Sequence, residues 1–313
     1  MTRASRNEES VRDLRDVPSF AAIMAAGLAP RPGVKRRRTL PTGAYRVRRV
    51  RIDPERAADF DHLMGGVATD VVHPGVLHVL AFPVALALMA QPGFPVPLLG
   101  LVHVRNSILQ HRPVRVGESV DATARVRNLR PHRRGTTFEA VTTIDDEHGI
   151  IATDVSTYLA KGVFLAGKPD DGGERARSTD RELFAPPVAT GRWTLGADTG
   201  RRYAAVSGDA NPIHLSALTA KAFGFPRAIA HGMYTASRAF TQARIDLHRP
   251  LRWDVEFGAP VTLPATVLVA FDHASDQRDG EAREIVRCLG WRAGRGDGKG
   301  PRKCFEVEIA QLA

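Results

Sequence analysis

An aspartate and a histidine, two side chains that can transfer protons, stand five residues apart in the stretch SGDANPIH, at Asp209 and His214. A positioned carboxylate or imidazole can remove a proton from a reacting group or return one, which is general acid–base catalysis. The Gly-Asp pair of this stretch is also typical of a helix end followed by a turn. Turn chemistry does not account for the histidine. Pro212 stiffens the loop, because it fixes its own φ and keeps Asn211 out of the helical region.

The elements that would position this loop occur twice along the chain. A segment rich in Gly, Pro, Asp and Arg at 166–188 predicts a linker between two similar halves. Each half predicts a strand, a helical run, a long helix and four further strands. The expected strands are 45–52, 99–110, 118–128, 135–145 and 149–161, then 192–195, 251–257, 261–272, 283–292 and 302–311. The expected helices are 54–66 and 76–90, then 199–209 and 231–244.

A sheet with one apolar face must cover that face, so we expect each long helix to be wrapped by an antiparallel sheet. This predicts an α+β fold of two units, 41–165 and 189–313. Residues 1–40 are expected to be an added arm, largely solvated, with one short helix at 18–28 packed on the body. The apolar run 76–90 either fills the first sheet or leaves room for an apolar ligand.

Composition and charge exclude several classes of protein. The 313 residues are 43% hydrophobic and 25% charged, as in globular proteins. We expect no secretory signal and no membrane span, because the N-terminus is charged and 76–90 is too short to cross a bilayer. Cys288 and Cys304 form no CxxC pair and the histidines form no ligand-like group. We therefore expect a cytoplasmic protein with no disulfide and no bound metal.

The net charge of +10 lies partly in 34–40 and 46–51. No nucleic-acid-binding motif accompanies it, and aromatic residues are only 6%, so we expect no nucleic-acid partner. Solvated arginine-rich faces explain most of the charge. Part of it could steer a polyanionic small molecule such as a nucleotide-bearing cofactor.

Taken together, the motif residues of the second half resemble the MaoC-like family of (R)-specific enoyl-thioester hydratases and dehydratases. They are Tyr203, Ser207-Gly208-Asp209, Asn211-Pro212-Ile213-His214 and His231-Gly232-Met233. That family has the hot-dog fold, and the whole chain is similar to its double hot-dog actinobacterial type, with one motif-bearing half and one degenerate half.

The resemblance implies that Asp209 and His214 are the catalytic pair. It also implies that the backbone N–H of Gly232 helps to form an oxyanion hole and that Asn211 shapes the substrate-binding loop. The implied reaction adds water to a trans-2-enoyl thioester, giving the (3R)-hydroxyacyl thioester, or removes it again. No cofactor is implied beyond the coenzyme A or acyl carrier protein that carries the acyl group. A monomer and a homodimer are both compatible with the sequence.

The first half departs from the motif. Aligning FDHLMGG with YAAVSGD places Gly66 and Val71 at the positions of Asp209 and His214, and neither can transfer a proton. We therefore expect one active site per chain. The remaining histidines of this half, among them His73, His78 and His103, are interpreted as structural or surface residues, and Tyr203 of the second half as a core residue.

Two other functions stay open. Hot-dog thioesterases often place a carboxylate on or near the long helix, whereas neither long helix here contains Asp or Glu. A non-catalytic acyl-thioester-binding subunit would be expected to have a degenerate loop in both halves, whereas the second half keeps both Asp209 and His214.

Overall fold

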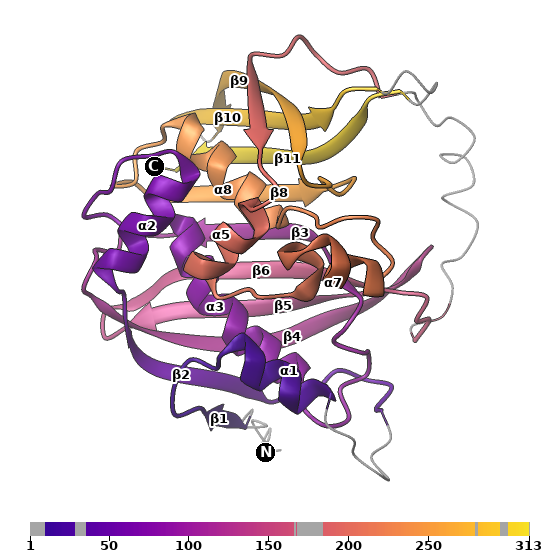
Figure 1. Ribbon diagram of the computed structural model, residues 1–313. Coiled ribbons are helices and arrows are strands. Elements are labelled where there is room, and N and C mark those ends of the chain that lie inside the picture. Colours follow the sequence, from indigo (N-terminus) through magenta and orange to yellow (C-terminus); the bar gives the residue numbers. More distant parts are fainter. Residues whose placement is uncertain are drawn as a thin grey trace.

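The computed structural model describes residues 10–28, 36–165, 167, 184–278, 281–294 and 300–312, which form a continuous sheet with helices against it (Figure 1). The strands are β1 (Val11–Asp13), β2 (Ala44–Arg51), β3 (Leu101–Gln110), β4 (Ser119–His132), β5 (Gly135–Asp146), β6 (Gly149–Lys161), β7 (Gly191–Leu195), β8 (Leu251–Phe257), β9 (Ala265–Arg278), β10 (Glu281–Arg292) and β11 (Arg302–Gln311). Their order in the sheet is β1-β2-β4-β5-β6-β3-β8-β11-β10-β9-β7.

This order contains the same unit twice. Read from the outer edge inward, the first half runs β2-β4-β5-β6-β3 and the second half runs β7-β9-β10-β11-β8, with β1 added outside β2. The units meet where β3 pairs antiparallel with β8, and Ile108 lies opposite Trp253 in that pairing. The predicted fold, α+β with two tandem hot-dog units, is confirmed.

The helices are α1 (Phe20–Leu28), α2 (Pro54–Met64), α3 (Pro74–Met89), α5 (Thr199–Ser207), α6 (Pro212–Leu215), α7 (Ala217–Ala222) and α8 (Gly232–Ala243). α3 packs on β2, β4 and β5, and α8 packs on β10 and β11, so each unit has its own long helix (Figure 1). α3 is apolar on nearly every side, which is typical of a fully buried helix. The interpretation of 76–90 as a buried helix is confirmed.

The strands bury alternate residues, as expected when helices cover one face of a sheet. In β5, Phe138, Ala140, Thr142 and Ile144 are buried, while Glu139, Val141 and Thr143 between them are half-buried. α2 begins where the Asp53 side chain accepts hydrogen bonds from two backbone N–H groups of the first turn, which is the usual role of an N-cap residue.

The start of β9 differs more from the prediction than that of any other strand. β9 starts at Ala265 rather than at residue 261. The Val261 carbonyl accepts a hydrogen bond from Ala230 N–H, and Leu263 N–H donates to the carbonyl of Ala228. The segment before β9 is therefore hydrogen-bonded to the chain that leads into α8 and not to a neighbouring strand of the sheet.

The N-terminal arm is more structured than its sequence indicates. The predicted short helix forms as α1, and its Ile23 is buried in a core cluster that includes Met89 of α3. β1 pairs parallel with β2, and Asp13 forms an ion pair with Arg46. All of β1 is exposed, so it has no hydrophobic pattern by which the sequence could reveal it.

The predicted linker, 166–188, lies mostly outside the described residues, and the domain boundaries drawn around it stay predictions. Among the described residues, no helix is long and apolar enough to cross a membrane.

The centre of the sheet supplies a stability test. Trp253 is fully buried in β8 and packs against the rings of His73 and Phe240. Trp253→Ala should lower the free energy of unfolding by about 3–5 kcal/mol, because it leaves a cavity where the halves join. Urea denaturation followed by circular dichroism measures this. Val188→Ala, at a position 88% exposed, should change the value by less than about 0.5 kcal/mol, and an equal loss in both variants would contradict the prediction.

Candidate active site

The loop after α5 begins with a left-handed residue. Gly208 has φ 75°, and its N–H donates to the carbonyl of Ala204 at 2.8 Å. Glycine adopts this conformation without steric cost, which is why it commonly ends helices. Asp209 follows directly, and its N–H donates to Ser207 Oγ at 3.1 Å. The end of α5 thus fixes the backbone position from which the Asp209 side chain extends.

The rest of the loop is held by Asn211 and Pro212. Asn211 has ψ 125°, outside the helical region, as the following proline requires. Its N–H donates to Asp209 Oδ1 at 3.2 Å, and its side-chain oxygen accepts from Ile213 N–H at 3.4 Å. The predicted stiff loop is present, and its stiffness comes from hydrogen bonds as well as from proline.

His214 lies on α6 with its ring turned toward the chain that leads into α8. Its Nδ1 is 2.8 Å from the carbonyl oxygen of Ile229. A carbonyl oxygen only accepts hydrogen bonds, so Nδ1 carries the proton and Nε2 has a free lone pair. The backbone therefore selects the tautomer that can act as a base through Nε2.

A third group, His231, completes a cluster with Asp209 and His214. One donor atom from each of the three residues lies within 4.8 Å of the others. The rings of His214 and His231 stack with 3.7 Å between centroids, and His231 Nε2 lies 3.0 Å from the carbonyl oxygen of Asp209. The motif includes His231, but the sequence indicates no particular role for it. Its position directly before Gly232 in the HGM motif is the one sequence signal for a role at the site. The contact with Asp209 could not be predicted, because α6 and α7 separate the two residues in the sequence.

Burial dominates the electrostatics of this cluster. It lowers the pKa of His214 to about 3, with a further lowering by His231 and an opposing effect of Asp209. Burial also lowers the pKa of His231 to about 4. The pKa of Asp209 is raised by burial, against the effects of His214 and the Asn211 N–H. Both imidazoles are therefore neutral near pH 7, the form in which a histidine can accept a proton.

Gly232 begins α8 beside this cluster. The first N–H groups of a helix have no partner within it, and its dipole favours negative charge there. A Cβ at Gly232 would lie only 2.8 Å from Cε1 of Phe257. Glycine is therefore the residue that fits between this ring and the start of the helix.

Tyr203 packs against the cluster from α5. It is 2% exposed, and its ring centroid lies 4.8 Å from that of His231. The desolvation that accompanies this burial raises the pKa of the Tyr203 hydroxyl. Its interpretation as a core residue is confirmed.

The first half confirms part of the alignment between the two units. Gly65 ends α2 with φ 85°, as Gly208 ends α5. Gly66 therefore occupies the position of Asp209, as predicted.

Val71, however, is not the counterpart of His214. Its backbone bridges Arg115 in the way that Ile229 bridges Thr262, so Val71 corresponds to Ile229. The first half lacks the segment that forms α6 and α7, and no residue stands at the position of His214. An alignment in fixed register could not detect this difference in length.

His73 corresponds to His231 but has a structural role. Its Nδ1 accepts a hydrogen bond from Gly75 N–H at 2.8 Å, which caps α3. Its ring packs against Phe60 and Phe240, and burial lowers its pKa to about 3. The prediction that His73 is structural is confirmed.

The three donors Asp209, His214 and His231 also form a set of the type that binds zinc. His214 uses Nδ1 in a contact with a backbone carbonyl, which leaves its Nε2 for a ligand or a substrate, whereas His231 Nε2, which lies 3.7 Å from Asp209 Oδ2, already contacts a backbone carbonyl. The expectation of no metal stays a prediction.

The region that contains this site matches a known protein family. Residues 180–287, which include the whole loop and α8, match the MaoC like domain family. The chain is 34% identical over 248 residues to 3-hydroxyacyl-thioester dehydratase X of Mycobacterium tuberculosis, which covers 78% of this chain and 85% of that protein. This chain belongs to the MaoC-like family.

Solved structures of MaoC-like proteins share its architecture. The crystal structure of HtdX from Mycobacterium tuberculosis aligns with a TM-score of 0.64 and 28% identity, covering 86% of this chain and 100% of that chain. A MaoC-like dehydratase from Phytophthora capsici aligns with a TM-score of 0.59 and 17% identity, covering 86% and 94%, which supports the fold alone.

The buried histidines predict that this MaoC-like protein loses stability in acid. Below a pH of about 6.5 these histidines bind protons in the unfolded chain but stay neutral in the folded chain. The free energy of unfolding is therefore highest above that pH and falls as the pH decreases. For His73, with a folded pKa of about 3, the loss between pH 7 and pH 5 is about 2 kcal/mol. His73→Asn keeps a capping oxygen but does not titrate, so it should lose about 2 kcal/mol less over this interval.

Urea denaturation at both pH values measures the difference. His148→Asn, which replaces an exposed histidine, should keep the pH dependence of the unmodified protein. An unchanged dependence in His73→Asn would contradict the assignment.

Proposed function

We propose that this MaoC-like protein catalyses the (R)-specific hydration of trans-2-enoyl thioesters to (3R)-hydroxyacyl thioesters, or the reverse dehydration. The observation that carries the proposal is the neutral His214, whose Nδ1 bonds to a backbone carbonyl beside the carboxylate of Asp209. The name of the relative from Mycobacterium tuberculosis, 3-hydroxyacyl-thioester dehydratase X, supports the same chemistry.

In the hydration direction, His214 Nε2 takes a proton from a water molecule as its oxygen attacks C3 of the enoyl group. Water is a weak nucleophile, and a positioned base typically contributes a factor of about 10²–10⁴ in rate. Asp209 accepts the second hydrogen of the water and so orients its lone pair. The proton taken from the water is then delivered to C2, so that the water has been added across the double bond and His214 is neutral again. Dehydration reverses these steps.

The thioester oxygen gains negative charge when C3 is attacked. We assign its stabilisation to the N–H of Gly232, at the positive end of α8. Asn211 acts through the loop, because its side chain and N–H bind neighbours on both sides. It is a positioning residue for Asp209 and His214.

The acyl group is carried on coenzyme A or an acyl carrier protein. Both carriers bring phosphate groups, which suits a chain of net charge +10. We expect the protein to work in the reducing cytoplasm, and its two cysteines are free and buried.

The thioesterase alternative lacks a carboxylate on either long helix: α3 and α8 contain no Asp or Glu. The binding-subunit alternative leaves unexplained why the backbone selects a base-competent tautomer of His214.

The catalytic pair is tested with Asp209→Asn and His214→Ala. Loss of enoyl-thioester absorbance is followed with crotonyl-coenzyme A and a longer enoyl-coenzyme A, and the product is identified with an (R)-specific coupling enzyme. Each variant should lose about 10²–10⁴-fold in kcat, while His148→Ala should keep full activity. Release of free thiol would instead indicate a thioesterase, and unchanged activity in both variants would remove the pair from the mechanism.

The oxyanion assignment is tested with Gly232→Ala. The added methyl group meets Phe257 and should displace the start of α8, lowering kcat about 100-fold. A second substitution, Phe257→Leu, removes the nearest ring atoms and should restore part of the activity. The same enoyl-coenzyme A assay measures both variants. Full activity of Gly232→Ala alone would show that the helix start does not bind the oxyanion.

A further inference from the structure

The first half contains a buried polar strip where its apolar helix suggests an apolar core. The strip consists of His78 on α3, His103 and Asn106 on β3, and Asp154 and Ser156 on β6. His78 Nδ1 lies 2.6 Å from Asp154 Oδ2, with both side chains less than one-tenth exposed. Ser156 donates to Asn106 Oδ1 at 2.8 Å. These residues lie on the helix-facing side of the sheet.

Some polar atoms of the strip take part in none of these hydrogen bonds. Asp154 Oδ1 and Asn106 Nδ2 are buried and have no hydrogen-bond partner among the described residues, while His103 interacts with the Asn106 side chain. Leaving such groups unpaired destabilises a fold, and apolar residues would fill a purely structural core as well or better. The strip therefore has the capacity to bind a further polar group.

Two ring contacts connect the strip to the catalytic cluster. The ring of His103 lies 6.0 Å from that of His78 and 5.1 Å from that of Phe257, measured between centroids. Phe257 in turn covers Gly232, where we place the thioester oxygen. In addition, His78 helps to lower the pKa of Asp209, against the larger effect of burial. Phe257 thus contacts both Gly232 and the strip residue His103.

The buried strip is suited to contact the acyl chain of the substrate and not its carrier. Asn106 is 0% exposed and Asp154 is 3% exposed, whereas the phosphates of a carrier must reach solvent. Asp154 Oδ1 can only accept a hydrogen bond and Asn106 Nδ2 can only donate one. A hydroxyl group does both, so it can pair with either atom.

We propose that the strip binds a hydroxyl group on the acyl chain, and that the preferred substrates are enoyl thioesters hydroxylated beyond the double bond. This inference rests on the proposed function, because it takes the thioester to lie at Gly232. It makes His78, Asn106 and Asp154 specificity residues, whereas the sequence indicated only structural or surface roles for the histidines of this half.

The test compares trans-2-octenoyl-coenzyme A with derivatives that carry a hydroxyl on each of the last four carbons in turn. The unmodified protein should convert at least one derivative with kcat/KM about tenfold above that of the plain substrate, the size expected for one hydrogen bond to a charged group. The double variant His78→Leu, Asp154→Leu should lose this preference, because its kcat/KM should fall less on the plain substrate than on the hydroxylated derivative.

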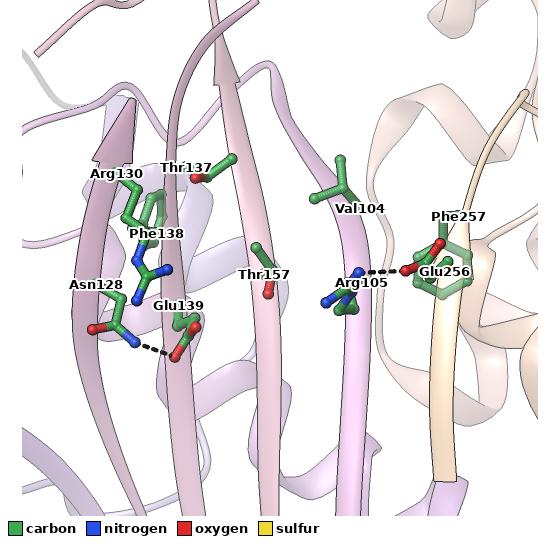
Figure 2. A pocket seen from close by; sticks show the side chains of 10 residues that line it. All are labelled: Val104, Arg105, Asn128, Arg130, Thr137, Phe138, Glu139, Thr157, Glu256 and Phe257. Carbon is green, nitrogen blue, oxygen red and sulfur yellow. Dashed lines mark hydrogen bonds and ion pairs between the residues drawn. The ribbon is translucent and has the colours of Figure 1, made fainter. Parts of the chain in front are cut away.

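Two further variants separate recognition from folding. Asp154→Asn keeps the shape of the side chain and should reduce the preference with little change in thermal unfolding. Thr157→Val lies on β6 next to Ser156 but on the opposite face, in a pocket where Arg105 of β3 meets Glu256 of β8 (Figure 2). It should keep the full preference. No hydroxyl preference in the unmodified protein, or equal losses on both substrates in the double variant, would overturn the inference.

Calorimetric binding of octanoyl-coenzyme A and its hydroxylated derivatives provides a readout without turnover. A binding preference that the double variant abolishes supports the strip even if no substrate is hydrated, in which case only the proposed reaction fails. Hydration of the plain substrate with no preference in rate or binding supports the reaction and rejects the strip.

Discussion

The structure depends on the antiparallel pairing of β3 with β8. This pairing turns two five-stranded units into one sheet and brings their helices together on it. The first half then supports the catalytic loop directly: Arg56 of α2 donates to the carbonyl of Val206 in α5 at 2.6 Å. His73 likewise reaches α8, with its Nε2 at 3.2 Å from Thr241 Oγ1. The first half is therefore part of the scaffold of the candidate active site, although it has no counterpart of Asp209 and His214.

Most of the fold could be predicted from the sequence because its strands alternate in polarity and its helices have local start and stop signals. β8 and β11 begin and end at the predicted residues. Asp209 and His214 were also predictable, since they lie on one short loop. Val71 was matched to the wrong residue because the two halves differ in loop length. β1 was missed because it is exposed and held only by its pairing with β2.

The remaining features arise from contacts between distant segments. His231 joins the cluster through a contact with Asp209 across α6 and α7, and the strip combines a helix with two strands far apart in the sequence. Neither pattern has a local spacing that would reveal it. Burial also sets the chemistry of the cluster. The desolvation that keeps His214 neutral makes it able to accept a proton, and the same desolvation destabilises the fold in acid.

Joining both units in one chain has a consequence for symmetry. Two identical subunits pair through the same patch on each copy, so any substitution appears on both sides of their interface. In a tandem chain each side can change independently, and the linkage keeps the partners at high effective concentration whatever the dilution. One side can therefore lose its catalytic loop and acquire buried charges such as Asp154, while the other side keeps its proton-transfer groups. A chain with two covalently linked units can therefore place recognition in one unit and catalysis in the other, whereas a homodimer of identical subunits cannot.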